Sequence, residues 1–147
     1  MNYSDFISVK HKINSQFAND LSLDVEIFEY RSECKDTLTI VASRDFSYYH
    51  NLEINLHEPK YFSGVFSWKN SPQDGGLIEI LDATQNALLI NENFIEDFAQ
   101  GVRFLNDDGI SIVAAASSIT VNFDTVFYYW RDNIKEGERI ADWVKKL

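Results

Sequence analysis

The sequence Leu23-Asp24-Val25-Glu26-Ile27 alternates apolar and acidic side chains, and Phe28 and Tyr30 continue the same stretch. A period of two is typical of a β-strand with one buried and one solvated face. Residues 32–36 are polar and charged, as in a turn, and residues 37–42 resume the strand pattern. Together these segments predict a β-hairpin.

Further strand patterns follow along the chain. Residues 52–57 alternate again, and Pro59 is expected to end this strand because proline lacks the N–H group that a β-ladder needs. Residues 71–76 have the composition of a loop and residues 106–109 that of a hairpin turn. Other expected strands span residues 61–68, 77–81, 102–105, 110–115 and 119–123, with a turn at Ser117 and Ser118 between the last two.

Helical spacing is clearest near the N-terminus. Phe6, Val9, Ile13 and Phe17 recur at intervals of three or four, which predicts an amphipathic helix over residues 4–18. A second helix is expected over residues 93–100, whereas residues 87–90 fit either a strand or the start of a helix. Residues 124–136 also fit either state, and a C-terminal helix is expected from Glu138 to the end.

This order of elements predicts one α+β domain covering residues 1–147. Its core is expected to be an antiparallel sheet of six to eight strands, with an N-terminal and a C-terminal helix. Such a sheet is also able to curl into a partly closed barrel. The lack of regular strand–helix alternation argues against a doubly wound parallel sheet.

The charge restricts the classes of partner. Thirteen Lys and Arg against 23 Asp and Glu give a net charge of −10, so we expect neither nucleic acid nor an anionic membrane surface as a partner. A basic protein partner fits this charge. The single cysteine, Cys34, excludes an intramolecular disulfide, and no signal peptide or apolar run long enough to span a bilayer is evident. A cytoplasmic location is the resulting expectation.

A search for chemistry finds no established motif. His50, Glu53 and His57 are the best candidates for a catalytic or metal site, but one row of one strand rarely supplies the three convergent ligands that zinc requires. Ser117 and Cys34 lack the sequence context of an activated nucleophile. We therefore expect no catalytic, cofactor-binding or metal-binding residues, and the sequence favours a non-enzymatic protein.

Surface composition instead suggests an interface. The acidic and aromatic residues of the first hairpin strand are expected to share one face, beside a polar row on a neighbouring strand. Aromatic anchors and complementary charge are typical of protein interfaces. The predicted partner-binding residues are Asp24, Glu26, Phe28, Tyr30, Glu53, Asn55 and His57.

Residues 24–68 resemble small bacterial toxin-immunity proteins. The likeness consists of the acidic–apolar hairpin, the segment at residues 51–64, and Trp68 closing the next strand. The resemblance implies a compact, acidic, cytosolic protein without enzymatic activity. It also implies inhibition of a partner toxin by covering the active site or substrate-binding surface of that toxin.

The leading hypothesis is therefore an immunity-type inhibitor that binds a basic toxin partner, such as a nuclease. One alternative is a carrier of small apolar ligands, with a cavity lined by Phe62, Phe66, Trp68 and Phe104. A second is an enzyme that uses His50, Glu53 and His57. A third is a homo-oligomeric structural protein, for example a homodimer paired through an exposed sheet edge.

Overall fold

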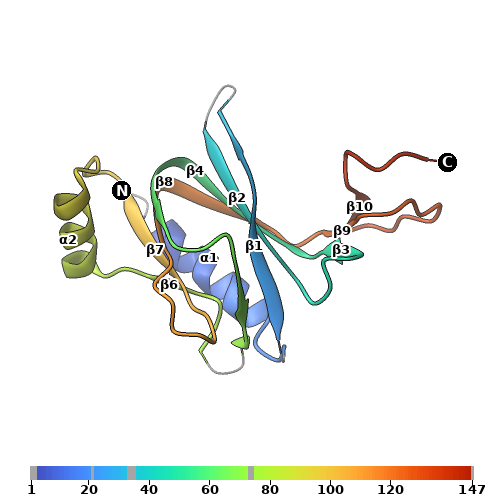
Figure 1. Ribbon diagram of the computed structural model, residues 1–147, viewed down its shortest axis with the longest axis horizontal. Helices are drawn as coiled ribbons and strands as arrows, with labels where there is room; N and C mark the ends of the chain where they lie inside the picture. The colour runs from blue at the N-terminus through green and yellow to red at the C-terminus, as the bar shows by residue number, and fades with distance from the viewer. Residues whose placement is uncertain (1–2, 21, 33–35, 73–74, 147) are drawn as a thin grey trace.

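The computed structural model describes residues 3–20, 22–32, 36–72 and 75–146, so Cys34 lies outside the described residues. The body of the molecule is a seven-stranded antiparallel sheet in the order β5-β1-β2-β4-β8-β7-β6 (Figure 1). Its strands are β1 (Leu23–Arg31), β2 (Thr37–Ser43), β4 (Leu52–Ser63), β5 (Ser67–Asn70), β6 (Ile78–Ile80), β7 (Gln100–Phe104) and β8 (Val113–Asn122). The predicted α+β class and the hairpin of residues 23–42 are confirmed.

The sheet curls until its two ends approach each other. The Asp107 amide, in the loop after β7, donates a hydrogen bond to the Lys69 carbonyl of β5 at 2.9 Å. Trp68 and Phe104 meet inside the curl with ring centroids 5.4 Å apart, whereas Phe66 is 82% exposed. The residues expected to line a ligand cavity therefore lie partly in a packed core and partly in solvent.

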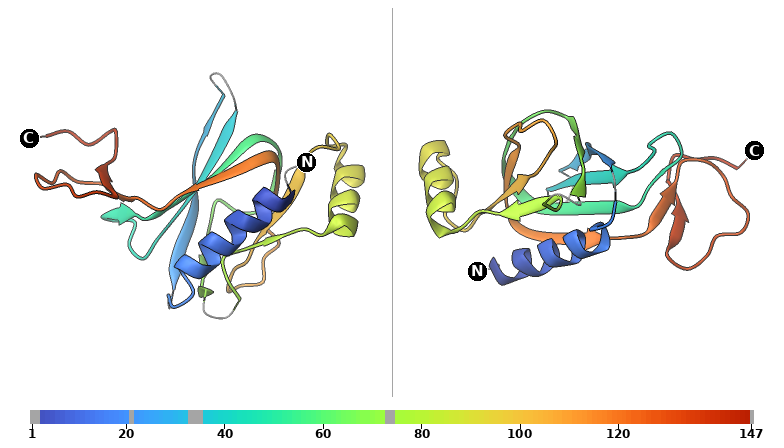
Figure 2. Two further views of the ribbon diagram at one scale, coloured as in Figure 1. Left: turned by 180° about the vertical axis from the view of Figure 1, so that it is seen from behind. Right: turned by 90° about the horizontal axis from the view of Figure 1, so that it is seen from below.

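Helix α1 (Tyr3–Gln16) confirms the expected N-terminal helix. Its apolar stripe, Phe6, Val9 and Ile13, is buried against the sheet, where the helix contacts β8 and β6 (Figure 2). Asn14 fastens this contact: its Oδ1 accepts from the Leu77 amide at 2.9 Å, and its Nδ2 donates to the Ile78 carbonyl at 3.4 Å. The helix is thus fixed by both apolar burial and polar complementarity.

Helix α2 (Ala83–Asn93) lies further toward the N-terminus than the helix expected over residues 93–100. Asp82 is its N-cap and forms a capping box with Gln85, which explains why the helix begins before residue 93. The helix ends at Phe94, whose backbone is left-handed (φ 54°, ψ 41°). Neither helix in the described part of the chain is both long and apolar enough to cross a membrane.

Two interruptions expected in the central strands do not occur. Strand β4 continues through Pro59 because a bulge between Pro59 and Tyr61 accommodates the proline, while Glu58 adopts a positive φ of 49°. Ser117 and Ser118 lie within the long strand β8 and not in a turn. The paired strands β4 and β8 therefore form an uninterrupted centre for the sheet.

The expected C-terminal helix is wrong for the described residues. A second sheet has the order β10-β9-β3 and consists of β3 (Tyr49–His50), β9 (Thr125–Phe127) and β10 (Glu138–Ile140). Strand β10 pairs in parallel with β9, and β9 pairs antiparallel with β3. The segment after Asp124 therefore begins with a strand, Thr125–Phe127, whereas its sequence fitted either a strand or a helix.

Replacing Asn14 by alanine is expected to lower the free energy of unfolding by about 1–3 kcal/mol, because the Leu77 amide loses its acceptor between α1 and β6. Ser15→Ala, on the exposed side of the same helix, should change it by less than about 0.5 kcal/mol. Denaturant unfolding of both variants would measure the difference. Equal stabilities would contradict the role given to Asn14.

Candidate functional site

A cleft of about 650 Å³ lies between the outer face of β1, β2 and β4 and the C-terminal segment that carries β9 and β10. The small sheet that closes one side of it stands at the opposite end of the molecule from α2 (Figure 1). The cleft is lined by Phe28, Glu29, Arg31, Thr37, Thr39, His50, Glu53, Asn55, His57, Val126, Arg139, Ala141, Asp142 and Trp143.

Strand register explains why the floor of the cleft is polar. Glu53, Asn55 and His57 alternate with buried Leu52, Ile54 and Leu56, so the polar set faces outward. Paired residues of neighbouring strands share a face. The β2 residues opposite them are Val41, Thr39 and Thr37, and the β8 residues opposite them are Asn122, Thr120 and Ser118.

A hydrogen-bonded chain crosses from the C-terminal segment to β4. The Tyr128 hydroxyl lies 2.6 Å from His50 Nδ1, His50 Nε2 lies 2.8 Å from Glu53 Oε2, and Arg139 donates to Glu53 Oε1 at 2.6 Å. His50 is fully buried, at 0% exposure. The chain joins the two sheets through side chains that are far apart in the sequence.

Electrostatics assign the donors in this chain. Burial alone would raise the pKa of Glu53, but the hydrogen bond from His50 and the positive charge of Arg139 outweigh it and lower that pKa below 4.5. Glu53 is thus a carboxylate acceptor near neutral pH, so His50 Nε2 donates to it. Burial, with the negative charges of Glu26 and Glu53, raises the pKa of Tyr128, which therefore stays a phenol within hydrogen-bond distance of His50 Nδ1.

This row of hydrogen-bonded side chains resembles a proton relay, but His50, its candidate general base, is not free to react with a substrate. A general base must offer a lone pair to the substrate. Both ring nitrogens of His50 bond within the protein, and the ring is packed edge-on against Phe28 and Tyr128 with centroids 5.3 and 5.5 Å apart. In this geometry the chain of side chains holds the cleft wall in place.

The rest of the floor is also internally bonded. Thr39 donates to Asn55 Oδ1 at 2.7 Å, and His57 Nε2 lies 2.8 Å from the Thr120 hydroxyl. His57 Nδ1 is 3.4 Å from the Thr37 hydroxyl. His57 therefore does not join His50 and Glu53, although sequence reasoning had grouped the three. Within the described residues, no three His, Cys, Asp or Glu side chains are placed to hold a metal ion.

The predicted partner-binding residues are only partly brought together. Phe28, Glu53, Asn55 and His57 line the cleft, where the Phe28 ring also packs on Trp143 at 5.7 Å. Glu26 is paired with Val41 in the row of Glu53 and acts electrostatically on Tyr128. Asp24 lies outside the cleft lining.

The expectation that Tyr30 shares the outer face is wrong. A bulge between Ile27 and Glu29 shifts the register, so Glu29 and Arg31 stand opposite Thr39 and Thr37. Tyr30 pairs instead with buried Leu38. Its ring is 56% exposed, and its hydroxyl donates to Asp36 at 2.8 Å.

The acidic character of this face is also weaker than its sequence suggests. Asp24 lies 4.0 Å from Lys69, Glu29 lies 2.9 Å from Arg31, and Glu53 bonds Arg139. Sequence reasoning missed Arg139 and Trp143 in the cleft lining, and Tyr128, which contacts His50. Arg139 lies 86 residues from the carboxylate it bonds, and no local pattern signals such a pair.

Comparison of the chain with protein-family models, with curated proteins and with solved structures gives no match. Its function therefore has to be inferred from its own residues and their geometry.

Replacing Glu53 by glutamine is expected to lower the free energy of unfolding by about 1–3 kcal/mol at neutral pH, because His50 and Arg139 lose a charged acceptor. The folded-state pKa of Glu53 lies below 4.5, so the stabilisation is present above pH 4.5 and disappears as the pH falls through that lower pKa. Unfolding curves at several pH values should therefore converge for wild type and variant in acid. A difference that is the same at every pH, or equal to that of exposed Glu136→Gln, would contradict this account.

Proposed function

We propose that the chain is a non-enzymatic protein-binding domain, an immunity-type inhibitor that binds and neutralises a basic protein such as a toxin nuclease. It acts in the cytoplasm and needs no cofactor. Binding covers the partner's active site or substrate-binding surface, and the inhibitor forms no covalent bond.

The observation that carries this proposal is the internally bonded state of the cleft. Its most reactive groups, His50, Glu53 and Tyr128, use their polar atoms on one another and on Arg139. An enzyme of this size would be expected to turn such groups toward a substrate. Here they stabilise a rigid surface, which suits recognition better than turnover.

Charge supplies the second line of support. At a net charge of −10 the molecule attracts a basic protein over long range and repels nucleic acid and anionic lipid. Aromatic side chains are the residue type that most often anchors interfaces, and several exposed ones lie at the two ends of the molecule. They are Tyr48 before β3 with Tyr129, Trp130 and Trp143 on the C-terminal segment, and Phe94 and Phe98 after α2.

Immobilised protein should capture a basic partner from an extract of its native host at about 0.05 M salt and release most of it at about 0.5 M, where screening shortens the range of charge attraction. An unrelated immobilised protein of equal size and net charge is the matched control. The captured protein would then be purified and its activity measured with and without this chain. Failure to capture any specific protein at either salt concentration would reject the proposal.

A further inference from the structure

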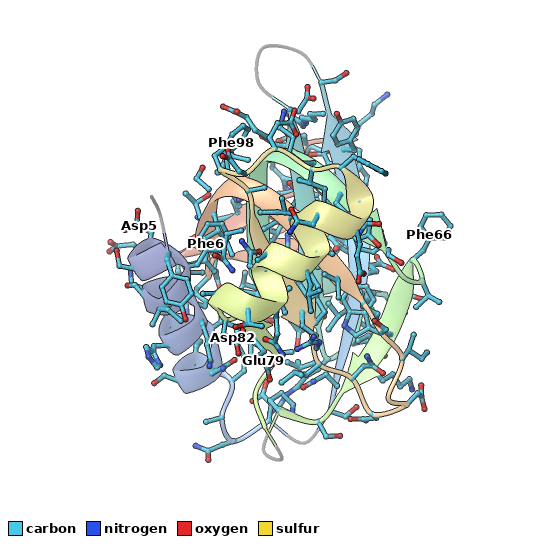
Figure 3. All side chains as sticks on the ribbon, turned by 90° about the vertical axis from the view of Figure 1, so that its left-hand side faces the viewer. Asp5, Phe6, Phe66, Glu79, Asp82 and Phe98 are labelled. Atoms are coloured by element: carbon cyan, nitrogen blue, oxygen red, sulfur yellow. The ribbon has the colours of Figure 1, made fainter. Side chains whose placement is uncertain are left out.

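The end of the molecule that carries α2 has an unusual display of apolar side chains. Phe94 is 96% exposed, Leu88 is 55% exposed and Phe98 is 43% exposed. Figure 3 looks onto this end, with Asp82 at the start of α2 and Phe98 beyond the end of the helix. In contrast with α1, no residue of α2 is buried.

Phe94 is held in a conformation that its own chemistry disfavours. The left-handed backbone at a helix C-terminus is normally taken by glycine or asparagine, because a Cβ atom is crowded there. Phe94 adopts it with φ 54° and ψ 41°, and its amide donates to the Ile90 carbonyl. Burial of the ring does not offset the free-energy cost of this backbone conformation, because the ring is exposed to solvent.

The charged residues of this stretch of sequence are all acidic, and the cations near them, Lys60 and Arg103, come from β4 and β7, with the Lys60 ammonium also 5.5 Å from the centroid of the Phe98 ring. Residues 75–102 contain five carboxylates, those of Glu79, Asp82, Glu92, Glu96 and Asp97, and no lysine or arginine. Glu79 pairs with Arg103 and Glu96 with Lys60. In the described part of the chain Glu92 and Asp97 have no ion pair.

The other aromatic end differs in charge. Residues 124–147 contain five acidic and five basic residues, namely Asp124, Asp132, Glu136, Glu138 and Asp142 against Arg131, Lys135, Arg139, Lys145 and Lys146. The carboxylates of the cleft are largely paired as well. Of the two aromatic ends, the α2 end therefore carries more negative charge in its own residues and attracts a basic partner more strongly.

A shallow groove forms a second part of this surface. It has a volume of about 680 Å³ and runs between α2 and the start of α1. Ala83, Ala87, Ile90 and Tyr3 give it apolar walls, and Asp97 places a carboxylate in it. An apolar side chain next to a lysine or arginine would match this lining.

We infer that the α2 surface, defined as Phe94, Asp97 and Phe98 with the adjoining groove, docks a basic protein segment that carries apolar side chains between its cations. Phe94 is the anchor, and Asp97 supplies charge complementarity. This inference rests on the proposed function and names the surface that performs it. The cleft at the other end is the competing location.

The test uses two capped hexapeptides as probes, one alternating lysine with leucine and one alternating lysine with serine. Titration of the isotope-labelled full chain by NMR should shift resonances of α2 and of residues 92–98, with tighter binding of the leucine peptide. Phe94→Gly should weaken that binding by about tenfold, in the range of an interface anchor. The same variant should raise the midpoint of thermal unfolding by about 2–4 °C, because glycine relieves the left-handed position.

Two matched controls test whether binding depends on the position of these residues or only on their chemical type. Phe66→Gly removes another exposed phenylalanine, in the connection between β4 and β5, and should leave peptide binding unchanged. Asp97→Lys should weaken binding by about tenfold or more, whereas Asp108→Lys, an equal change in net charge at an exposed position elsewhere, should weaken it only slightly.

Several outcomes would overturn the inference. These are shifts concentrated in the cleft, equal affinity of Phe94→Gly and wild type, or concentration-dependent shifts of α2 without peptide, which would assign the surface to a second copy of the chain. Because the probes are synthetic, the inference can fail while host capture succeeds. The proposed function can likewise fail while the peptides bind at α2.

Discussion

The antiparallel pairing of β4 with β8 is the constraint on which the other parts depend. These two long strands lie at the centre of the sheet, and their register extends from Glu53 opposite Asn122 to Ser63 opposite Val113. The inner side chains of both strands belong to the same core as the apolar stripe of α1, and the outer side chains of β4 form the polar floor of the cleft. The bulge after Pro59 adds twist to the same pair, which favours the curl of the sheet.

Local patterns predicted much of this fold because a helix or strand with one buried face repeats apolar residues at a fixed interval in the sequence. The stripe of α1 and the alternation of β1 and β2 were read correctly for that reason. The C-terminal segment was not, since residues around Ile134 and Ala141 are spaced as in a helix while the backbone of β10 pairs with β9. A tertiary pairing there overrides local preference. Pro59 was expected to end its strand, but the strand continues through it. The bulge accommodates a residue that has no N–H group for the β-ladder.

The candidate site was harder to predict than the fold. Alternation identified Glu53, Asn55 and His57 as an outward row, and the structure places all three in the cleft. The same reasoning failed at Tyr30, because one extra residue in a bulge reverses which side chains face outward. Arg139 lies in the segment that was expected to be a C-terminal helix, and its bond to Glu53 depends on two sheets meeting. Periodicity within a strand carries no information about such a meeting.

The separation of α1 and β8 along the chain affects how the protein is made. The apolar stripe of α1 is covered by β8, which begins at Val113, so a ribosome releases the helix long before its packing surface exists. At roughly 5–20 residues per second, that interval is on the order of ten seconds. The nascent helix spends this time with Phe6, Val9 and Ile13 open to solvent or to a chaperone. Completion of the core therefore waits until β8 has left the ribosome.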